Sequence, residues 1–186
     1  MLSLTDLKTG TNIELRGEPY VVIAYEHGKL GRGGAFMRTK LRSLLTGNVI
    51  EETFKGNVAV AEADIEKKHS NFLYAQNDKL FFMDSVTFEQ YELPKSALGE
   101  RGKFLKEGLE VAVMLWQGRA INIEMPIKVE FKIVSTPPGI RGDTVSGGTK
   151  PATLDSGATI NVPLFINEGE IIRVNTEEGN YVERVK

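Results

Sequence analysis

The chain has 186 residues, of which 41% are hydrophobic and 26% charged, as in an ordinary globular protein. Its net charge of −2 argues against indiscriminate binding of nucleic acid, and the lack of cysteine excludes disulfides, thiolate zinc sites and cysteine nucleophiles. No stretch is long and apolar enough for a membrane-spanning helix, and Asp6 interrupts the apolar run of a signal peptide. We therefore expect a cytoplasmic protein without a membrane partner.

Short strands dominate the first 64 residues. The expected strands are Asn12–Leu15, Tyr20–Tyr25, Ala35–Leu44 and Val49–Phe54, and the segments between them contain glycine. Glycine-bearing turns at intervals of about eight to twelve residues indicate a small barrel rather than alternating strands and helices.

Two further sets of strands follow, in residues 65–126 and 127–186, and small closed barrels of the oligonucleotide-binding type fit both. Ser96–Lys106 is the one stretch with helical spacing of its apolar residues, so we expect one short helix there. We therefore predict an all-β protein with domains 1–64, 65–126 and 127–186. Met125–Lys128 is expected to form a small hinge, with the second and third barrels packed more closely than the first and second.

A cluster of positive charge lies between residues 29 and 42, where the chain has five cations and no acid. The cations are Lys29, Arg32, Arg38, Lys40 and Arg42. Alternation along a strand places the last three of these on one face with Phe36, and Met37, Thr39 and Leu41 on the other. Such a row of cations is either a solvated strand face or a track for phosphate groups.

Motifs that would indicate an enzyme are scarce. His27 and His69 have no metal-ligand spacing; we expect His27 at a turn and His69 in a solvated, charged connection. No Gly-x-Ser-x-Gly motif occurs, and the glycine-rich segment His27–Phe36 is no phosphate-binding loop, because Lys-Ser/Thr does not follow its glycines. We expect no catalytic site, no metal and no cofactor.

The segment Ser135–Pro151 consists largely of Pro, Gly, Ser and Thr and is longer than an ordinary connection within a barrel. Loops of this length often carry function, and a floppy hairpin is the other interpretation.

Ordered motifs along the whole chain resemble the bacterial elongation factor P family. They are GEPY (17–20), GRGGAF (31–36), KLRSLLTG (40–47), FFMD (81–84), TFEQY (87–91), GDT (142–144), KPA (150–152), VPLF (162–165) and GNYVERVK (179–186). The resemblance implies a first barrel of the KOW/SH3-like kind and two OB-fold barrels, arranged as an L that imitates transfer RNA.

The resemblance also implies a function. A monomeric factor would bind both subunits of the ribosome beside the P-site peptidyl-tRNA, contact the mRNA, and relieve stalls at consecutive prolines by positioning the CCA end of the tRNA. The factor would lower the entropic cost of bringing the tRNA end into the reactive alignment, and the ribosome would carry out the chemistry.

The site residues follow from the same resemblance. The implied contacts to tRNA are Lys29, Gly31, Arg32, Gly33, Arg38, Lys40 and Arg42, and those to mRNA or ribosome are Arg141, Gly142, Asp143, Thr144, Lys150, Tyr181 and Arg184. Asp143 would accept hydrogen bonds from amides or base amino groups, while Arg141 or Lys150 meets the backbone.

Arg32 stands at the implied tip of the first domain, where the commonest family pattern is Pro-Gly-Lys-Gly and this chain has Leu30-Gly31-Arg32-Gly33. Arginine occupies the tip in a branch where a glycosyltransferase adds rhamnose, whereas the flank Gly33–Phe36 resembles the lysine branch. Arg32 is thus either rhamnosylated or unmodified, and enzymes that modify lysine should not act on its guanidinium.

Two alternatives stay open. One is an elongation factor P-like paralogue, which the sequence separates poorly from the family proper. The other is a general binder of single-stranded nucleic acid, which predicts aromatic side chains on exposed strand faces. Only 8% of the residues are aromatic, which counts against the second alternative.

Overall fold

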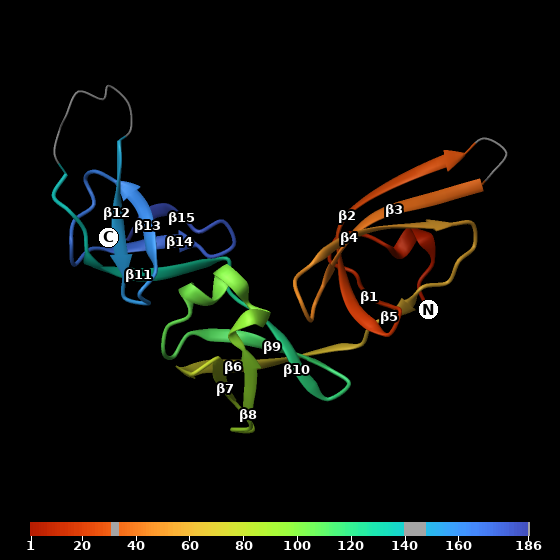
Figure 1. Ribbon diagram of the computed structural model, residues 1–186, viewed down its shortest axis with the longest axis horizontal. Helices are drawn as coiled ribbons and strands as arrows, with labels where there is room; N and C mark the ends of the chain where they lie inside the picture. The colour runs from red at the N-terminus through yellow and green to blue at the C-terminus, as the bar shows by residue number, and fades with distance from the viewer. Residues whose placement is uncertain (31–33, 140–147, 186) are drawn as a thin grey trace.

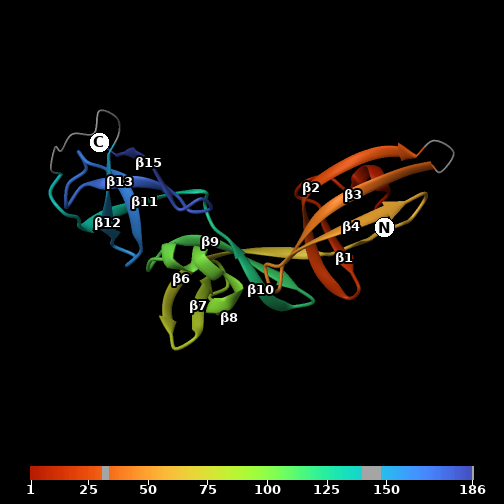
Figure 2. The same cartoon turned by 45° about the horizontal axis from the view of Figure 1, so that its top comes forward.

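The computed structural model describes residues 1–30, 34–139 and 148–185, which fold into three domains, each built on one five-stranded sheet (Figure 1). The domains follow one another in a bent row with the middle domain at the bend, as Figure 1 and Figure 2 show from two directions. The all-β prediction is confirmed, and the bend agrees with the expected L shape. No helix that the structure describes is long and apolar enough to cross a membrane.

The first domain is an antiparallel sheet in the order β4-β3-β2-β1-β5, preceded by a short 3₁₀ helix, η1 (Leu4–Asp6). Its strands are β1 (Asn12–Leu15), β2 (Glu18–Leu30), β3 (Gly34–Ser43), β4 (Val49–Lys55) and β5 (Ala61–Glu62). Leu4 and Leu7 pack with the inward-facing Ile13, Val22 and Leu41, so the N-terminal turn contributes to the core. Strand β2 extends beyond the expected Tyr25 and contains His27, which is therefore exposed on a strand and not at a turn.

The second domain has the order β10-β9-β6-β7-β8, the arrangement of a small barrel. Its strands are β6 (Ile65–Gln76), β7 (Lys79–Asp84), β8 (Gln90–Pro94), β9 (Glu110–Trp116) and β10 (Arg119–Glu124). Strand β6 begins at Ile65, so His69 lies within a strand and not in a connection, with its side chain exposed.

The helix expected at Ser96–Lys106 is wrong in type. Two 3₁₀ helices occupy the region, η3 (Lys95–Ala97) and η4 (Gly99–Phe104), separated by Leu98, and η4 begins at Gly99 with a φ of +53°. A residue in the left-handed region interrupts a right-handed helix, so the positive φ of Gly99 prevents η3 and η4 from forming one continuous helix. Phe104 and the neighbouring apolar residues are buried all the same.

The third domain has the order β13-β12-β11-β14-β15. Its strands are β11 (Lys128–Ser135), β12 (Thr149–Leu154), β13 (Thr159–Pro163), β14 (Ile171–Asn175) and β15 (Asn180–Arg184). The long segment between β11 and β12 begins and ends at paired strands, and residues 140–147 within it lie outside the described part of the chain.

The second and third domains share one continuous apolar core. The rings of Phe104 and Phe131, one from each domain, lie 6.0 Å apart between centroids. Lys106 joins the same junction, because its Nζ donates to the carbonyl oxygen of Glu130 at 2.6 Å and lies 5.1 Å from the centroid of the Phe131 ring. The linker is also fastened: Thr176 donates its hydroxyl to the carbonyl of Pro126 at 2.8 Å. These contacts do not support the hinge expected at Met125–Lys128.

The first and second domains meet over a much smaller contact. Its buried part consists of Leu44, Met114 and Ile121, and Asn122 donates its Nδ2 to the carbonyl oxygen of Leu44 at 3.0 Å. The second and third domains are therefore packed more closely than the first and second, in agreement with the expected order.

Candidate nucleic-acid interface

The exposed face of β3 carries the row of cations expected from the sequence. Arg38, Lys40 and Arg42 are exposed, whereas Met37, Thr39 and Leu41 between them are buried. The predicted alternation of β3 is thus confirmed.

Acidic residues from the neighbouring strands lie beside two of these cations. The Arg38 guanidinium is 3.8 Å from the Glu26 carboxylate on β2, and the Lys40 ammonium is 3.4 Å from that of Glu51 on β4. Both pairs are more than half exposed, so each contributes little to stability, but each reduces the local positive potential. The segment Lys29–Arg42 contains no acid in sequence, yet acids on the neighbouring strands lie beside two of its cations.

Arg42 differs from the other two. Its cross-strand neighbours are Val21 on β2 and Val49 on β4, and it makes no ion pair with any residue that the structure describes. Arg42 is therefore the member of the row whose charge is most available to a ligand.

The hairpin of β2 and β3 is paired from Tyr20 opposite Ser43 to Leu30 opposite Gly34, with one register shift between Val22 and Ala24. Near its end the Phe36 ring lies directly on Gly28, since a Cβ at position 28 would be 2.3 Å from the ring Cζ. Only glycine leaves room for this contact, which covers exposed backbone with an aromatic side chain. The paired strands β2 and β3 therefore run in a defined direction, away from the middle domain (Figure 1).

Several predicted tRNA contacts cannot be placed. Gly31, Arg32 and Gly33 lie outside the described residues, as does the side chain of Lys29. What the structure supplies for them is the pair of strands that leads to this segment.

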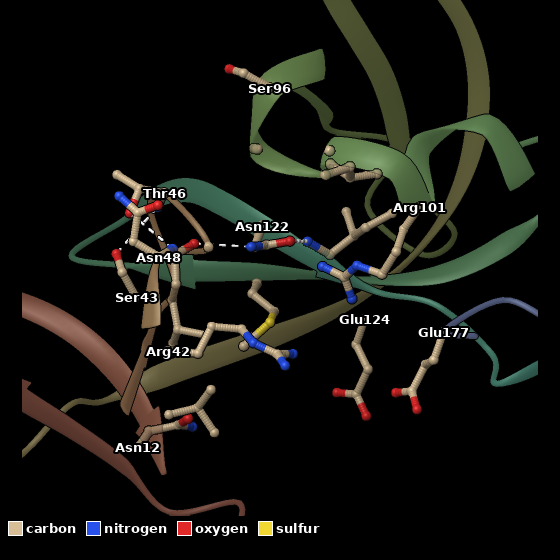
Figure 3. Close-up of a pocket in the computed structure, with 18 of the residues that line it drawn as sticks. Asn12, Arg42, Ser43, Thr46, Asn48, Ser96, Arg101, Asn122, Glu124 and Glu177 are labelled. Carbon is tan, nitrogen blue, oxygen red and sulfur yellow. Dashed lines mark hydrogen bonds between the residues drawn. The ribbon is translucent and has the colours of Figure 1, made fainter. Parts of the chain in front are cut away.

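Arg42 also lines a hollow of about 810 Å³ at the junction of the domains (Figure 3). Arg101 from η4 enters the same hollow, and Asn122, Glu124 and Glu177 contribute polar groups to its lining. Glu177 comes from the turn between β14 and β15, so all three domains take part. Sequence analysis did not single out Arg101, because nothing in its local pattern indicates that it would face Arg42.

The two arginines converge with like charge (Figure 3). Burial and then repulsion by Arg42 lower the pKa of Arg101 from its usual value. Within the part of the chain that the structure describes, no carboxylate lies within ion-pair distance of either guanidinium. A pair of guanidinium groups in a concave setting fits a phosphate, which accepts paired hydrogen bonds from each.

We expect replacement of Asn122 by alanine to loosen the first domain from the second. The buried Leu44 carbonyl would lose its donor, and the backbone N–H of Ile123 would lose the Asn122 Oδ1 acceptor at 2.8 Å. The free energy of unfolding should fall by about 1–3 kcal/mol, as measured in urea. Small-angle scattering should show a broader distribution of shapes. Asn71→Ala, which removes two exposed hydrogen bonds within the second domain and none between domains, is the control. Unchanged scattering and stability for Asn122→Ala would show that this bond does not hold the junction.

The predicted contacts in the third domain have different surroundings. Arg141, Gly142, Asp143 and Thr144 lie outside the described residues. Lys150 is buried, and its Nζ donates to the carbonyl oxygen of Pro137 at 2.8 Å. Its ammonium is therefore engaged inside the protein, and the expectation that Lys150 meets a nucleic-acid backbone does not agree with its position.

Tyr181 and Arg184 lie on β15. Tyr181 packs against the core shared by the second and third domains, and the Arg184 guanidinium lies 3.1 Å from the Glu170 carboxylate. Each side chain thus has a structural contact, and Arg184 is also partly exposed.

Three family models match the chain in sequence. They are the "Elongation factor P (EF-P) KOW-like domain" at residues 3–60, the "Elongation factor P (EF-P) OB domain" at 65–123 and "Elongation factor P, C-terminal" at 129–184. Together the matched segments cover most of the chain, one segment to each sheet.

Full-length relatives show the same similarity. Elongation factor P of Natranaerobius thermophilus is 48% identical over 186 residues, covering 100% of this chain and 99% of the relative. Elongation factor P of Synechococcus sp. (strain JA-3-3Ab) is 47% identical over 184 residues, covering 99% and 100%. That of Aquifex aeolicus is 48% identical over 174 residues, covering 94% and 91%.

Among solved structures, eukaryotic translation initiation factor 5A from Methanococcus jannaschii shares the fold over part of the chain. The TM-score is 0.52 at 22% identity, and the match covers 67% of this chain and 93% of the other.

Proposed function

This chain belongs to the elongation factor P family and is a translation elongation factor, and from that premise we propose that it binds the ribosome beside the P-site peptidyl-tRNA and stimulates peptide-bond formation at consecutive prolines. Proline reacts slowly because its ring restricts the geometry of attack. A factor that fixes the tRNA end lowers the entropic part of the barrier and leaves the bond-forming chemistry to the ribosome.

The observation that carries this proposal is the β2–β3 hairpin, which projects from the first domain with a cationic outer face. In the proposed complex the segment Lys29–Gly33 reaches the CCA end, with Arg32 at its tip. Arg38, Lys40 and Arg42 lie along the flanking phosphates, and Arg42 and Arg101 together hold a phosphate at the domain junction.

The third domain supplies the proposed contacts to mRNA and to the small subunit. Arg141, Gly142, Asp143 and Thr144 remain the proposed contacts in its long loop, and Tyr181 and Arg184 on β15 are proposed as further contacts. Lys150 is proposed instead to anchor the base of that loop, because its amine is bound to the Pro137 carbonyl.

Arg32 is proposed to act in one of two forms, bare or carrying rhamnose from a glycosyltransferase partner. The intact mass of the protein purified from its native host distinguishes them directly.

The experiment that tests the function is translation in a purified system with two templates. One encodes three consecutive prolines, and the other encodes the same peptide with alanines in their place. We expect the protein to accelerate synthesis on the first template only. Equal rates on the proline template with and without the protein would contradict the proposal.

We expect Arg42 to contribute more to binding than Lys40, because Glu51 already neutralises Lys40. Arg42→Gln should weaken binding to 70S ribosomes carrying P-site tRNA several-fold and reduce the salt slope by about one. Lys40→Gln, on the same strand face, should change both quantities less. Equal losses for the two variants would show that the cross-strand acids do not govern the interface.

General binding of single-stranded nucleic acid has one observation in its favour. Tyr74 and Phe81 form a stacked pair on the second domain, with ring centroids 4.8 Å apart, and Tyr74 is exposed. Aromatic pairs on OB-fold strands can stack on bases. Titration of bare oligonucleotides tests it: tight, salt-sensitive binding without ribosomes would favour this function over the first.

A further inference from the structure

The turn between β7 and β8 presents two apolar side chains to solvent. Val86 is 79% exposed and Phe88 is 69% exposed, and of the large apolar side chains in the described residues only Met1 is more exposed than Val86. The two residues are separated only by Thr87, so they form one apolar projection, which we call the Val86–Phe88 knob. A surface patch of this kind is typical of an interaction site rather than of an isolated exposed residue.

The backbone of Phe88 has an unfavourable conformation for its side chain. Phe88 has a φ of 59°, in the left-handed region where a bulky residue is sterically disfavoured. Three other non-glycine residues of the described chain share a positive φ: Arg16, Asn77 and Gln117. All three are polar and belong to two-residue hairpin turns, where this conformation is usual. Phe88 is the exception in both respects, which indicates that its side chain is present for contact with something outside the domain.

The knob is held rigidly from beneath. The buried carboxylate of Asp84 accepts hydrogen bonds at its Oδ1 from the backbone N–H groups of Val86 at 2.7 Å and Thr87 at 2.8 Å. The N–H of Phe88 donates to the Asp84 carbonyl at 3.1 Å, and the Asp84 N–H donates to the Glu89 carbonyl at 2.8 Å. The bonds from the Thr87 and Val86 amides lower the pKa of Asp84, so the carboxylate stays ionised at neutral pH.

A second set of bonds fixes the turn to the neighbouring strand. The Ser85 N–H donates to the His69 carbonyl at 2.9 Å, and its hydroxyl donates to Asn71 Oδ1, also at 2.9 Å. A turn that is already ordered loses little entropy when a partner covers it. The knob is therefore preorganised for contact.

The charge around the knob selects among partners. The segment Leu80–Pro94 contains three acids, Asp84, Glu89 and Glu92, and neither lysine nor arginine. The neighbouring Lys68 is paired with Glu66, and Lys79 with Glu92. A negative surrounding repels a phosphate backbone and is complementary to lysine and arginine on another protein.

We propose that the Val86–Phe88 knob inserts into an apolar socket, edged by lysine or arginine, on a protein of the ribosome. The choice of the ribosome rests on the proposed function. The knob lies in the second domain, away from the hairpin that is proposed to reach the tRNA end (Figure 1), so it is a separate anchoring point. The knob would contact a protein, whereas the hairpin is proposed to contact RNA.

The variant Phe88→Gly tests whether the Phe88 side chain contributes to binding or to stability. Glycine adopts a positive φ without steric conflict, so the melting temperature should stay equal or rise. Affinity for salt-washed 70S ribosomes carrying P-site tRNA should fall about tenfold if the aromatic anchors the contact. Asn77→Gly is the matched control, since it makes the same exchange at a positive φ in the same domain without removing an apolar side chain. It should leave both quantities unchanged.

A photo-crosslink identifies the kind of partner. With p-benzoylphenylalanine at position 88, the protein bound to the same ribosomes should crosslink to a ribosomal protein, and with the probe at position 77 it should not. A crosslink to ribosomal RNA overturns the proposal, as does unchanged affinity of Phe88→Gly while the wild type binds. Wild-type protein that does not bind ribosomes at all overturns the proposed function as well, so the two failures are distinguishable.

Discussion

Replacement of Arg32 by alanine is expected to abolish the acceleration of synthesis through three consecutive prolines while leaving the melting temperature unchanged. Arg32 is the only charged residue between Leu30 and Phe36, and its neighbours are glycines that bring no apolar side chain to a core. The purified translation system with proline and alanine templates measures the effect. Full activity of Arg32→Ala would eliminate the proposed role of the tip.

Arg32→Lys separates the two forms of the tip. Lysine keeps the positive charge but cannot accept a sugar that is transferred to a guanidinium. Partial activity is expected if the bare cation suffices, and none if rhamnose is required. The control is wild-type protein from a host that lacks the glycosyltransferase, because its intact mass shows that Arg32 is unmodified.

Replacement of Lys150 by methionine is expected to lower stability by about 1–3 kcal/mol, because the hydrogen bond from the buried Lys150 ammonium to the Pro137 carbonyl is lost. Methionine keeps most of the apolar stem, so the loss reports the hydrogen bond more than the packing. Chemical denaturation measures it, and Lys132→Met, on the exposed face of β11, is the control. Equal stability of the two variants would show that the ammonium does not anchor the loop.

Asp143→Ala, in contrast to Lys150→Met, should affect activity and not stability. We expect it to weaken stimulation on the proline template without a change in stability, as a contact to mRNA requires. A large drop in melting temperature for this variant would show that Asp143 has a structural role instead.

Local pattern predicted the strands where one face of a sheet is buried. Alternation of apolar and charged residues in Phe36–Arg42 determines which side chains of β3 point outward, since a shift by one residue would bury three cations. Turn residues marked most strand ends for the same local reason. The family resemblance then added the order of the domains.

Features that depend on neighbours distant in sequence could not be predicted in this way. Glu26 and Glu51 lie beside Arg38 and Lys40 only because of the strand register. Arg101 faces Arg42 only because two domains meet, and nothing in the sequence around Lys150 indicates that it is buried. Each of these features changes how available a charged side chain is to a ligand. The order of residues along the chain does not show this.

The small contact between the first and second domains has a mechanical consequence. The second and third domains share one core, so we expect them to move as one unit and the first domain to rotate about Leu44, Met114 and Ile121. The hairpin projects from the side of the first domain that faces away from this contact (Figure 2). A small rotation at the contact therefore produces a large displacement of the hairpin. Crystals grown under different conditions should superpose over residues 65–139 and 148–185 and differ by a rotation of the first domain about this point.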